Sequence, residues 1–333
     1  MNGADRKEIN MLEWCKVTTL EAIGQAGFGY SFGALKDNHS PYIDTMKNVI
    51  PTFSSLFRLK GYIGPMFRLI PRSLSRAVAK WVPSGCIQRI GEMIDTQAKY
   101  SIDILESGKA TLSDSTIGES RDILSTLSTP TFSRVKQENK LSEDQLRGQI
   151  NTIMFAGFET TSSSLARTIH FLAEHPHIQD QLREELQAAR ADLRDCDTLP
   201  YLDAVIRETL RLFPPVPTIE RDTWGDDAEE FRPERWLNPL PQSVSKGGIP
   251  GVYSSMMTFG AGPRSCIGYK FAVLELKIIL ARLVETFRFA PGQQPVEWRN
   301  LGFMSPHVTN KGEDGTVVLD KAPSLPLSVS ILR

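Results

Sequence analysis

Cys266 is the residue whose surroundings in this sequence point most clearly to chemistry. It lies in the segment FGAGPRSCIG, residues 259–268, where three glycines and one proline predict a rigid turn. Apolar spacing after this turn predicts a helix from about Cys266 to Phe287. The positive end of a helix favours a thiolate over a thiol, and a thiolate is either a metal ligand or a nucleophile.

A catalytic thiolate needs a base, and no motif places a histidine beside Cys266. The four cysteines are widely separated and contain no C-x-x-C pair, so they give no zinc or dithiol motif. The chain has five histidines: His39, His170, His175, His177 and His307. Ligation of iron is therefore the favoured role of Cys266. A thiol nucleophile and a small buried cysteine without chemistry are the alternatives.

A long helix is predicted over residues 142–175, because Ser142 and Gln145 form a capping-box pattern and Pro176 ends the periodicity. In its middle, residues 156–161 read AGFETT. Glycine and threonine are unfavourable inside helices, so this segment is expected to have another purpose. In an oxygen-activating site, a small residue makes room beside a flat cofactor, while a hydroxyl and a carboxylate relay protons. Helix packing or a bend is the alternative.

The remaining pattern predicts more helices and few strands. In chain order the predicted helices are the start of 8–35, short pieces of 36–84, and residues 87–105, 142–175, 178–195, 202–213 and 266–287. The polar residues 106–140 predict an exposed loop. Residues 325–331 alternate as a strand does, with 316–319 as a hairpin partner. The predicted fold class is mainly α with a small β-sheet.

The composition is that of an ordinary globular protein. The 333 residues carry 38 Lys and Arg against 39 Asp and Glu, and this balance argues against a nucleic-acid binder. No apolar run is long enough to span a membrane, and residues 1–10 lack the apolar centre of a signal peptide. The cysteines form no disulfide framework, so a reducing compartment is expected.

The segment around Cys266 matches F-x-x-G-x-R-x-C-x-G, and on this motif the sequence resembles the cytochrome P450 superfamily, in particular its fungal microsomal members. The resemblance implies that Cys266 is the axial thiolate ligand of the iron of haem b. It also implies that Phe259 shields the sulfur and Arg264 contacts a haem propionate. Two further cofactor-binding positions follow from the same loop: Gly262 and Gly268.

Two more motifs carry the resemblance. The family's distal-helix motif A-G-x-E/D-T-T/S matches residues 156–161. It implies that Thr160 and Glu159 relay protons to dioxygen and that Ala156 and Gly157 form the oxygen-binding groove.

Glu208 and Arg211 lie three residues apart on one helical face, and at a solvated surface such a pair contributes at most about 1 kcal/mol. They also match the family's E-x-x-R, and FRPERW at 231–236 matches its F-x-P-x-R-W. The resemblance implies a buried structural triad of Glu208, Arg211 and Arg235.

The resemblance also implies an organisation for the chain. We expect a single P450-like domain over residues 1–333, with peripheral helices in 1–140, a haem-binding core in 141–290 and a C-terminal β-hairpin in 291–333. The family's N-terminal third is missing, and so are the strands that it carries between the positions of Pro217 and Trp224. The expected P450-like fold is therefore incomplete.

The expected function is a haem-thiolate monooxygenase that inserts one oxygen atom from O2 into a small lipophilic molecule, such as a terpenoid-like secondary metabolite. An NADPH-dependent P450 reductase is the expected electron donor. The resemblance implies a monomer at the cytoplasmic face of the endoplasmic reticulum membrane, although this chain has no transmembrane anchor. The alternative is a truncated P450-like protein without catalytic activity, acting as a binding or regulatory module or having no function.

Overall fold

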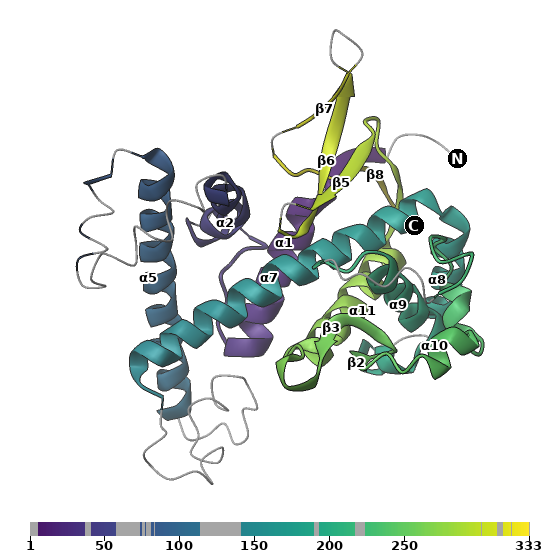
Figure 1. Cartoon of the computed structure of the whole chain (residues 1–333), viewed down its shortest axis with the longest axis horizontal. Helices are drawn as coiled ribbons and strands as arrows, with labels where there is room; N and C mark the ends of the chain where they lie inside the picture. The colour runs from purple at the N-terminus through teal and green to yellow at the C-terminus, as the bar shows by residue number, and fades with distance from the viewer. Residues whose placement is uncertain are drawn as a thin grey trace. The chain divides into compact units, whose positions relative to one another are not determined.

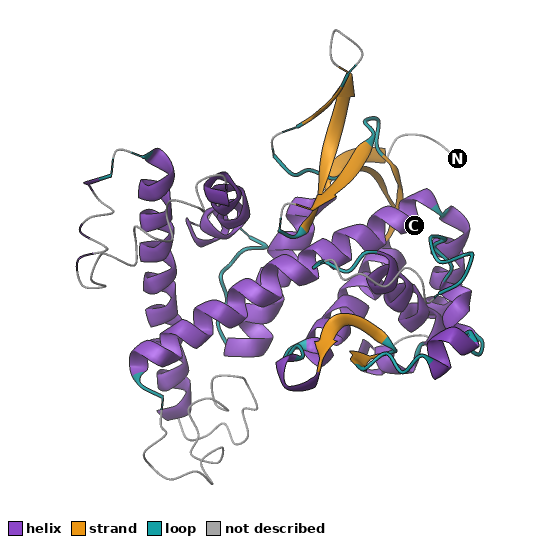
Figure 2. Ribbon diagram, viewed as in Figure 1, coloured by secondary structure: helices purple, strands orange, loops and turns teal. Residues whose placement is uncertain are grey.

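The computed structural model describes residues 6–36, 41–57, 74, 77, 81–82, 84–113, 141–189, 193–216, 224–300, 302–311, 316–320 and 322–332. The chain forms two compact units, one of residues 1–16 with 159–333 and the other of residues 17–158. Helices dominate both units, and the strands form small antiparallel sheets (Figure 2). The predicted fold class, mainly α with a small β-sheet, is confirmed.

The described elements are labelled in Figure 1. The helices are α1 (Met11–Ala22), η2 (Ile23–Gly27), α2 (Pro41–Phe57), α5 (Gly85–Ser113), α7 (Glu143–Glu174), α8 (Pro176–Ala189), η5 (Leu193–Thr198), α9 (Pro200–Leu212), η7 (Pro233–Leu237), α10 (Gln242–Lys246), η8 (Gly262–Arg264) and α11 (Tyr269–Thr286). The strands are β1 (Arg6–Asn10), β2 (Gly251–Tyr253), β3 (Met256–Ala261), β4 (Phe287–Pro291), β5 (Val296–Asn300), β6 (Met304–Lys311), β7 (Val317–Leu319) and β8 (Pro326–Ile331).

The long helix α7 begins where the sequence predicts it. The Ser142 hydroxyl accepts a hydrogen bond from the Gln145 amide at 3.3 Å, and the Gln145 side chain accepts one from the Ser142 amide at 2.8 Å. This reciprocal capping box satisfies two backbone donors at the helix start. The helix runs through both units, and its second half belongs to the unit that also contains Cys266.

The unit of residues 17–158 contains an aromatic cluster. The rings of Phe32 and Tyr42 stack with centroids 4.7 Å apart, and Tyr42 lies 4.8 Å from Tyr100 of α5. The predicted loop at 106–140 is wrong for residues 106–113, because α5 continues to Ser113. Packing of the preceding turns outweighs the weak helix propensity of these polar residues. The rest of that predicted loop lies outside the described residues.

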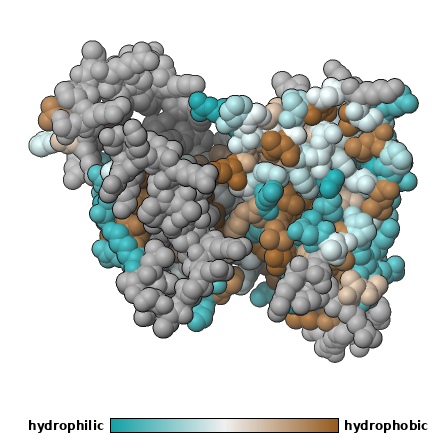
Figure 3. Space-filling view, turned by 90° about the horizontal axis from the view of Figure 1, so that it is seen from below, coloured by the Kyte–Doolittle hydropathy of each residue, from teal (hydrophilic) through white to brown (hydrophobic). Residues whose placement is uncertain are grey.

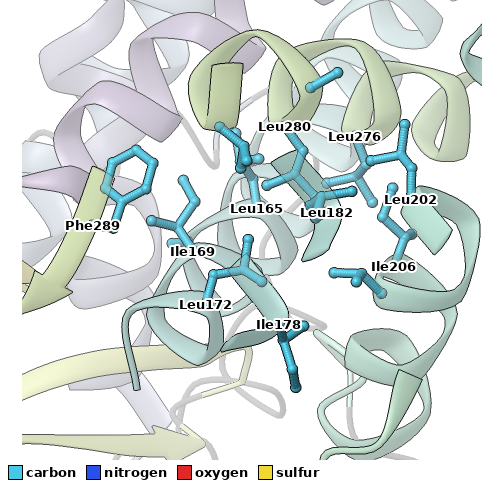
Figure 4. Packing of buried hydrophobic residues seen from close by; sticks show 14 of the residues in the cluster. Leu165, Ile169, Leu172, Ile178, Leu182, Leu202, Ile206, Leu276, Leu280 and Phe289 are labelled. Atoms are coloured by element: carbon cyan, nitrogen blue, oxygen red, sulfur yellow. The ribbon is translucent and has the colours of Figure 1, made fainter. Parts of the chain in front are cut away.

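The core of the other unit lies between α7, α8, α9 and α11. Figure 4 shows side chains from these helices, with Phe289 of β4, pointing toward one another. The labelled members on α7 repeat every three to four residues, at Leu165, Ile169 and Leu172, as expected for a helix with one buried face. This buried face fixes the rotation of α7 about its own axis. It therefore also fixes the directions in which Glu159, Thr160 and Thr161 point.

The C-terminal strand pairs differently from the prediction. β8 is the middle strand of a sheet with the order β1-β8-β4, with Ile9 opposite Leu327 and Phe289 opposite Val329. The predicted hairpin partner, β7, pairs with β6 instead. The helix expected to start near residue 8 is preceded by β1, an exposed strand whose partner lies more than 300 residues away. Local patterning does not report such distant pairing.

The described surface mixes polar and apolar residues. On the face that Figure 3 draws, brown hydrophobic patches lie among teal and white residues. Large apolar side chains that are exposed in the unit containing Cys266 include Trp14, Leu237, Ile267 and Leu274. Among the described residues, no helix is both long enough and apolar enough to cross a membrane.

Candidate active site

The loop that contains Cys266, residues 259–268, is called the cysteine loop below; it includes the last residues of β3 and leads to α11. It follows the β2–β3 hairpin, whose turn has Ser254 and Ser255 in the left-handed region, at φ of 49° and 54°. Such turns match the twist of paired strands. An added Cβ at Gly251 would lie 1.7 Å from the Met256 carbonyl oxygen, so this position requires glycine. The hairpin thus fixes the position of β3, from which the cysteine loop continues.

Two glycines turn the backbone inside the cysteine loop. Gly260 and Gly262 have φ of 69° and 64°, in the region that favours glycine. The Cys266 amide donates a hydrogen bond of 2.8 Å to the Phe259 carbonyl oxygen, and the Ser265 amide donates one of 3.1 Å to Gly262. These bonds close the loop on itself, so its shape is set by its own backbone.

Cys266 is a free, exposed cysteine, and its neighbour Ile267 is 97% exposed. The helix predicted from about Cys266 starts three residues later, at Tyr269, with Gly268 as N-cap at φ of −94° and ψ of 9°. The predicted start is wrong because the loop's own hydrogen bonds hold residues 259–266 outside the helix. The sulfur is therefore positioned by the loop and lies before the first helical turn.

Phe259 anchors the cysteine loop to the rest of its unit. Its ring packs against the hydrophobic core and lies 5.5 Å from Tyr253 in a T-shaped arrangement and 6.1 Å from Tyr269. Arg264 and Gly262 are exposed. The loop thus has one residue that holds it in place, while its basic side chain and its thiol face outward.

Cys266 suits an iron whose ligands are mostly supplied by a cofactor and not by protein side chains. Within the described residues, no three His, Cys, Asp or Glu side chains are grouped so that they could hold a bare metal ion. A single thiolate could hold the iron of haem, because the macrocycle would supply most of the iron's ligands. The residues present therefore fit the cofactor that the sequence motif implies.

A thiol nucleophile finds less support. The described histidines each contact or bond a residue other than Cys266, and they are His170, His175, His177 and His307. Among the described residues, the thiol therefore has no histidine positioned as its base.

In the AGFETT segment, Glu159 forms a buried ion pair. Its side chain is 6% exposed, and its Oε1 atom lies 3.3 Å from Lys16 Nζ on α1. Burial raises the pKa of Glu159, and the Lys16 ammonium opposes that rise. Thr160 follows it on α7 and is half-buried. The carboxyl group of the ion pair therefore lies on the same turn of α7 as the threonine.

The small residues of the same segment have different surroundings. Ala156 is exposed. An added Cβ at Gly157 would lie 2.2 Å from the Ile23 Cδ1 atom of η2, so the absence of a side chain at Gly157 accommodates Ile23. The sequence motif assigned the space beside Gly157 to a cofactor, because the sequence alone does not show that Ile23 lies next to this glycine.

Glu208 is fully buried and accepts hydrogen bonds from several donors. Arg211 Nε and Nη2 donate at 2.8 and 2.9 Å, and Arg235 Nε donates at 3.3 Å. The Arg232 amide and the Trp236 indole N–H donate at 3.0 and 2.9 Å. The structure therefore brings together the three residues of the expected triad, and it joins α9 to η7 through them.

Two partners of this network were missed by sequence reasoning. Asp227 Oδ1 accepts a 2.8 Å bond from Arg235 Nη1, and this bond is the main cause that lowers the pKa of Asp227. The Thr258 hydroxyl donates a 2.8 Å bond to the Leu210 carbonyl oxygen, which joins β3 to α9. Neither residue belongs to a recognisable motif, so no local signal identified them.

Comparison with known proteins places the chain in a family. The family model described as "Cytochrome P450" matches residues 2–227 and 221–311. A cytochrome P450 monooxygenase 91 of Postia placenta is 35% identical over 383 positions, covering 98% of this chain and 69% of the relative. A cytochrome P450 monooxygenase 81 of the same fungus is also 35% identical, covering 98% and 68%. A ganoderic acid synthetase of Ganoderma lucidum is 34% identical, covering 91% and 66%.

These alignments also bear on the segment missing after Pro217. The alignment of 383 positions is longer than the 333-residue chain, so the relative carries residues with no counterpart here. The two family-model matches meet at residues 221–227, close to the expected gap. The coverage and identity of these matches, together with the cysteine loop and the Glu208 network, show that the chain belongs to the cytochrome P450 family.

Proposed function

We propose that this chain is a haem-thiolate monooxygenase that inserts one oxygen atom from O2 into a small lipophilic molecule. The observation that carries the proposal is the exposed Cys266 thiol in a closed, glycine-turned loop, and the described residues contain no group of three or more His, Cys, Asp or Glu side chains that could hold a bare metal ion. Haem b, when bound through this thiolate, supplies the iron at which dioxygen is activated.

The residues of the chain then have separate tasks. Cys266 supplies the thiolate, Phe259 holds the loop against the core, and Arg264 is a positive group for a haem propionate. The cofactor-contact roles of Gly262, Gly268, Ala156 and Gly157 stay predictions, and Gly157 also accommodates Ile23.

Proton delivery is assigned to the Glu159–Lys16 pair and Thr160. Burial makes the Glu159 carboxylate a stronger base than an exposed one, since its pKa is raised. Lys16 Nζ, 3.3 Å from Glu159 Oε1, stabilises the charge when the proton leaves the carboxyl. Thr160, the next residue, supplies the hydroxyl through which the proton moves on from this pair.

The finer points of the proposal rest on the family and its named relatives. The relative called a ganoderic acid synthetase supports a terpenoid-like secondary metabolite as the substrate class. An NADPH-dependent P450 reductase is the proposed electron donor, and the proposed setting is the cytoplasmic face of the endoplasmic reticulum membrane, with the enzyme as a monomer.

The activity is tested by incubating the haem-loaded chain with reductase, NADPH, isotopically labelled dioxygen and a panel of lipophilic terpenoids. The proposal predicts a product that carries one labelled oxygen atom by mass spectrometry, and no product from Cys266→Ala. Labelled product from Cys266→Ala at the wild-type rate would contradict it.

A P450-like protein without catalytic activity is the second candidate. The relative's residues that have no counterpart in this chain favour this candidate. Thermal unfolding with and without haemin separates the two candidates, since a ligand that binds only the folded chain raises the melting temperature. A rise that Cys266→Ala abolishes supports the monooxygenase. An unchanged melting temperature supports the second candidate.

A further inference from the structure

A buried acid on α11 has no hydrogen-bond partner among the residues that the structure describes. Glu275 is 6% exposed, and neither of its carboxyl oxygens is bonded to any described residue. The hydroxyl of Thr161 on α7 is also buried and without a bonded partner among the described residues. Burying a polar group without a hydrogen-bond partner costs free energy of folding. Two such groups on α7 and α11 therefore need a structural explanation.

Thr161 differs from Ser164 and Thr168, two hydroxyl residues further along its helix. The Ser164 hydroxyl donates to the Thr160 carbonyl oxygen at 3.0 Å, and the Thr168 hydroxyl donates to the Ser164 carbonyl oxygen at 2.8 Å. Such bonds to the preceding turn are the ordinary use of these side chains inside a helix. The Thr161 hydroxyl makes no such bond and instead interacts with the carboxyl group of Glu275. Both groups thus lack a hydrogen-bond partner among the described residues, although the Thr161 hydroxyl lowers the pKa of Glu275.

The charge state of Glu275 makes the pair complementary. Burial raises the pKa of Glu275 to about 8, and the Thr161 hydroxyl opposes that rise. No charged group among the described residues contributes to this shift. At neutral pH the carboxyl therefore keeps its proton and has an O–H donor, while the hydroxyl oxygen of Thr161 is an acceptor.

The position of the pair gives it a consequence for the site. Leu165 lies one turn after Thr161, Leu276 follows Glu275, and both leucines belong to the core in Figure 4. Thr161 directly follows Thr160, the residue assigned to proton delivery. Glu275 lies on the helix that follows the cysteine loop. The two groups therefore lie on the helix of the proton-delivery residues and on the helix that follows the cysteine loop.

We propose that Glu275, as a neutral carboxylic acid, donates a hydrogen bond to Thr161 and so holds the α7 turn of Glu159 and Thr160 in place relative to α11. Glu275 and Thr161 are positioning residues in this proposal, not catalytic ones. The consequence for catalysis rests on the proposed monooxygenase function, whereas the hydrogen bond itself does not.

The bond is tested on the full chain by a double-mutant cycle in urea denaturation. Thr161→Val leaves the carboxyl unpartnered and is expected to lower the folding equilibrium constant about tenfold. In the Glu275→Met background, which keeps the side-chain length, Thr161→Val is expected to cost almost nothing. An equal cost of Thr161→Val in both backgrounds would overturn the bond. If Glu275→Met does not fold, Thr161→Ser, which keeps the hydroxyl, must recover the stability that Thr161→Val loses.

Thr168→Val is the matched control, because Thr168 is equally buried on α7 but bonds its own helix. Its cost is expected to be the same with Glu275 or Met at position 275. Coupling as large as that of Thr161 would mean that the cycle reports general loosening of α7, which would contradict a specific pair.

The positioning role is tested after haemin is added. Glu275→Met is expected to keep the thiolate-type absorption of the reduced CO complex, yet to convert a several-fold smaller share of the consumed dioxygen into product. Glu275→Gln, which keeps a donor, is expected to restore that share. Full conversion by Glu275→Met would overturn the positioning role. Loss of the thiolate-type absorption in the wild-type chain would instead overturn the proposed function and leave the cycle as a separate result.

Discussion

The Thr258 hydroxyl donates a 2.8 Å hydrogen bond to the main-chain carbonyl oxygen of Leu210. Thr258 immediately precedes Phe259, where the cysteine loop begins, and Leu210 lies between the two triad residues Glu208 and Arg211 on α9. The strand that leads into the thiolate is thus bonded directly to the helix whose position the buried charge network fixes. Damage to that network is therefore expected to reach Cys266 through β3.

Glu208→Gln tests this network. The variant keeps the shape of the side chain but leaves the guanidinium groups of Arg211 and Arg235 without their shared counter-charge. Removing one member of a buried ion cluster is expected to lower the free energy of unfolding by about 3–5 kcal/mol. Urea denaturation measures this loss. Glu184→Gln, at an exposed position of α8, is the control and should change stability by less than about 0.5 kcal/mol. Equal effects would contradict the account.

Two glycines in the cysteine loop can be substituted to distinguish the effect of backbone strain from the effect of steric crowding by a new Cβ atom. Neither Gly262 nor Gly268 has any atom near the position of an added Cβ, but Gly262 has a φ of 64° and Gly268 a φ of −94°. Gly262→Ala is therefore expected to lower stability by about 1–2 kcal/mol, and Gly268→Ala by no more than a few tenths. Thermal unfolding of the chain before haemin is added makes the comparison. A larger loss for Gly268→Ala would mean that another contact governs the loop.

Lys16→Met tests the ion pair with Glu159. Without the ammonium, burial alone acts on the carboxyl, so the pKa of Glu159 rises further. The variant is expected to lose about 1–3 kcal/mol of stability at neutral pH. The double variant Lys16→Met with Glu159→Gln removes the uncompensated acid and should recover part of that loss in the same denaturation experiment. A double variant less stable than either single variant would show that the two side chains act independently.

The raised pKa of Glu275 predicts how stability depends on pH. Its folded-state pKa of about 8 lies above the ordinary value of 4.5, so the folded chain binds this proton more tightly than the unfolded chain between those two values. The free energy of unfolding should therefore fall as pH rises through this window, by up to about 1.4 kcal/mol per pH unit from this group, and level off above it.

Glu275→Gln removes the titrating group and should flatten that part of the profile. The measurement is the difference between the wild-type and Gln profiles from urea denaturation at several pH values, which cancels the other titrating residues. Glu184→Gln should keep the wild-type slope. A difference that does not change between pH 5 and 8 would show that Glu275 is ionised in the folded chain.

Much of the site-bearing framework follows from local sequence. The capping residues Ser142 and Gln145 define the start of α7, because a capping box is a contact between residues three apart. Glu208 and Arg211 are likewise close in sequence and share one helical face. The glycines of the cysteine loop predict its turn, because positive φ angles at Gly260 and Gly262 need glycine.

The rest depends on contacts between distant residues. β1 has an exposed, polar strand pattern and is defined by its pairing with β8, at the other end of the chain. The sequence of strand β7 is too short to indicate which strand pairs with it. In the structure it pairs with β6 rather than β8. The bond from Thr258 to Leu210 and the pair of Thr161 with Glu275 join residues far apart in sequence, so only the folded chain reveals them.

The proposed role of Cys266 as the thiolate ligand of a haem iron is tested by the reduced CO absorption spectrum after reconstitution with haemin. The wild-type chain and Cys86→Ala, which removes a half-buried cysteine outside the site, are predicted to show the thiolate-type Soret band. Cys266→Ala is predicted to lose that band while keeping its folded helical content. An unchanged thiolate-type band in Cys266→Ala, or its absence from the wild-type chain, would contradict the account.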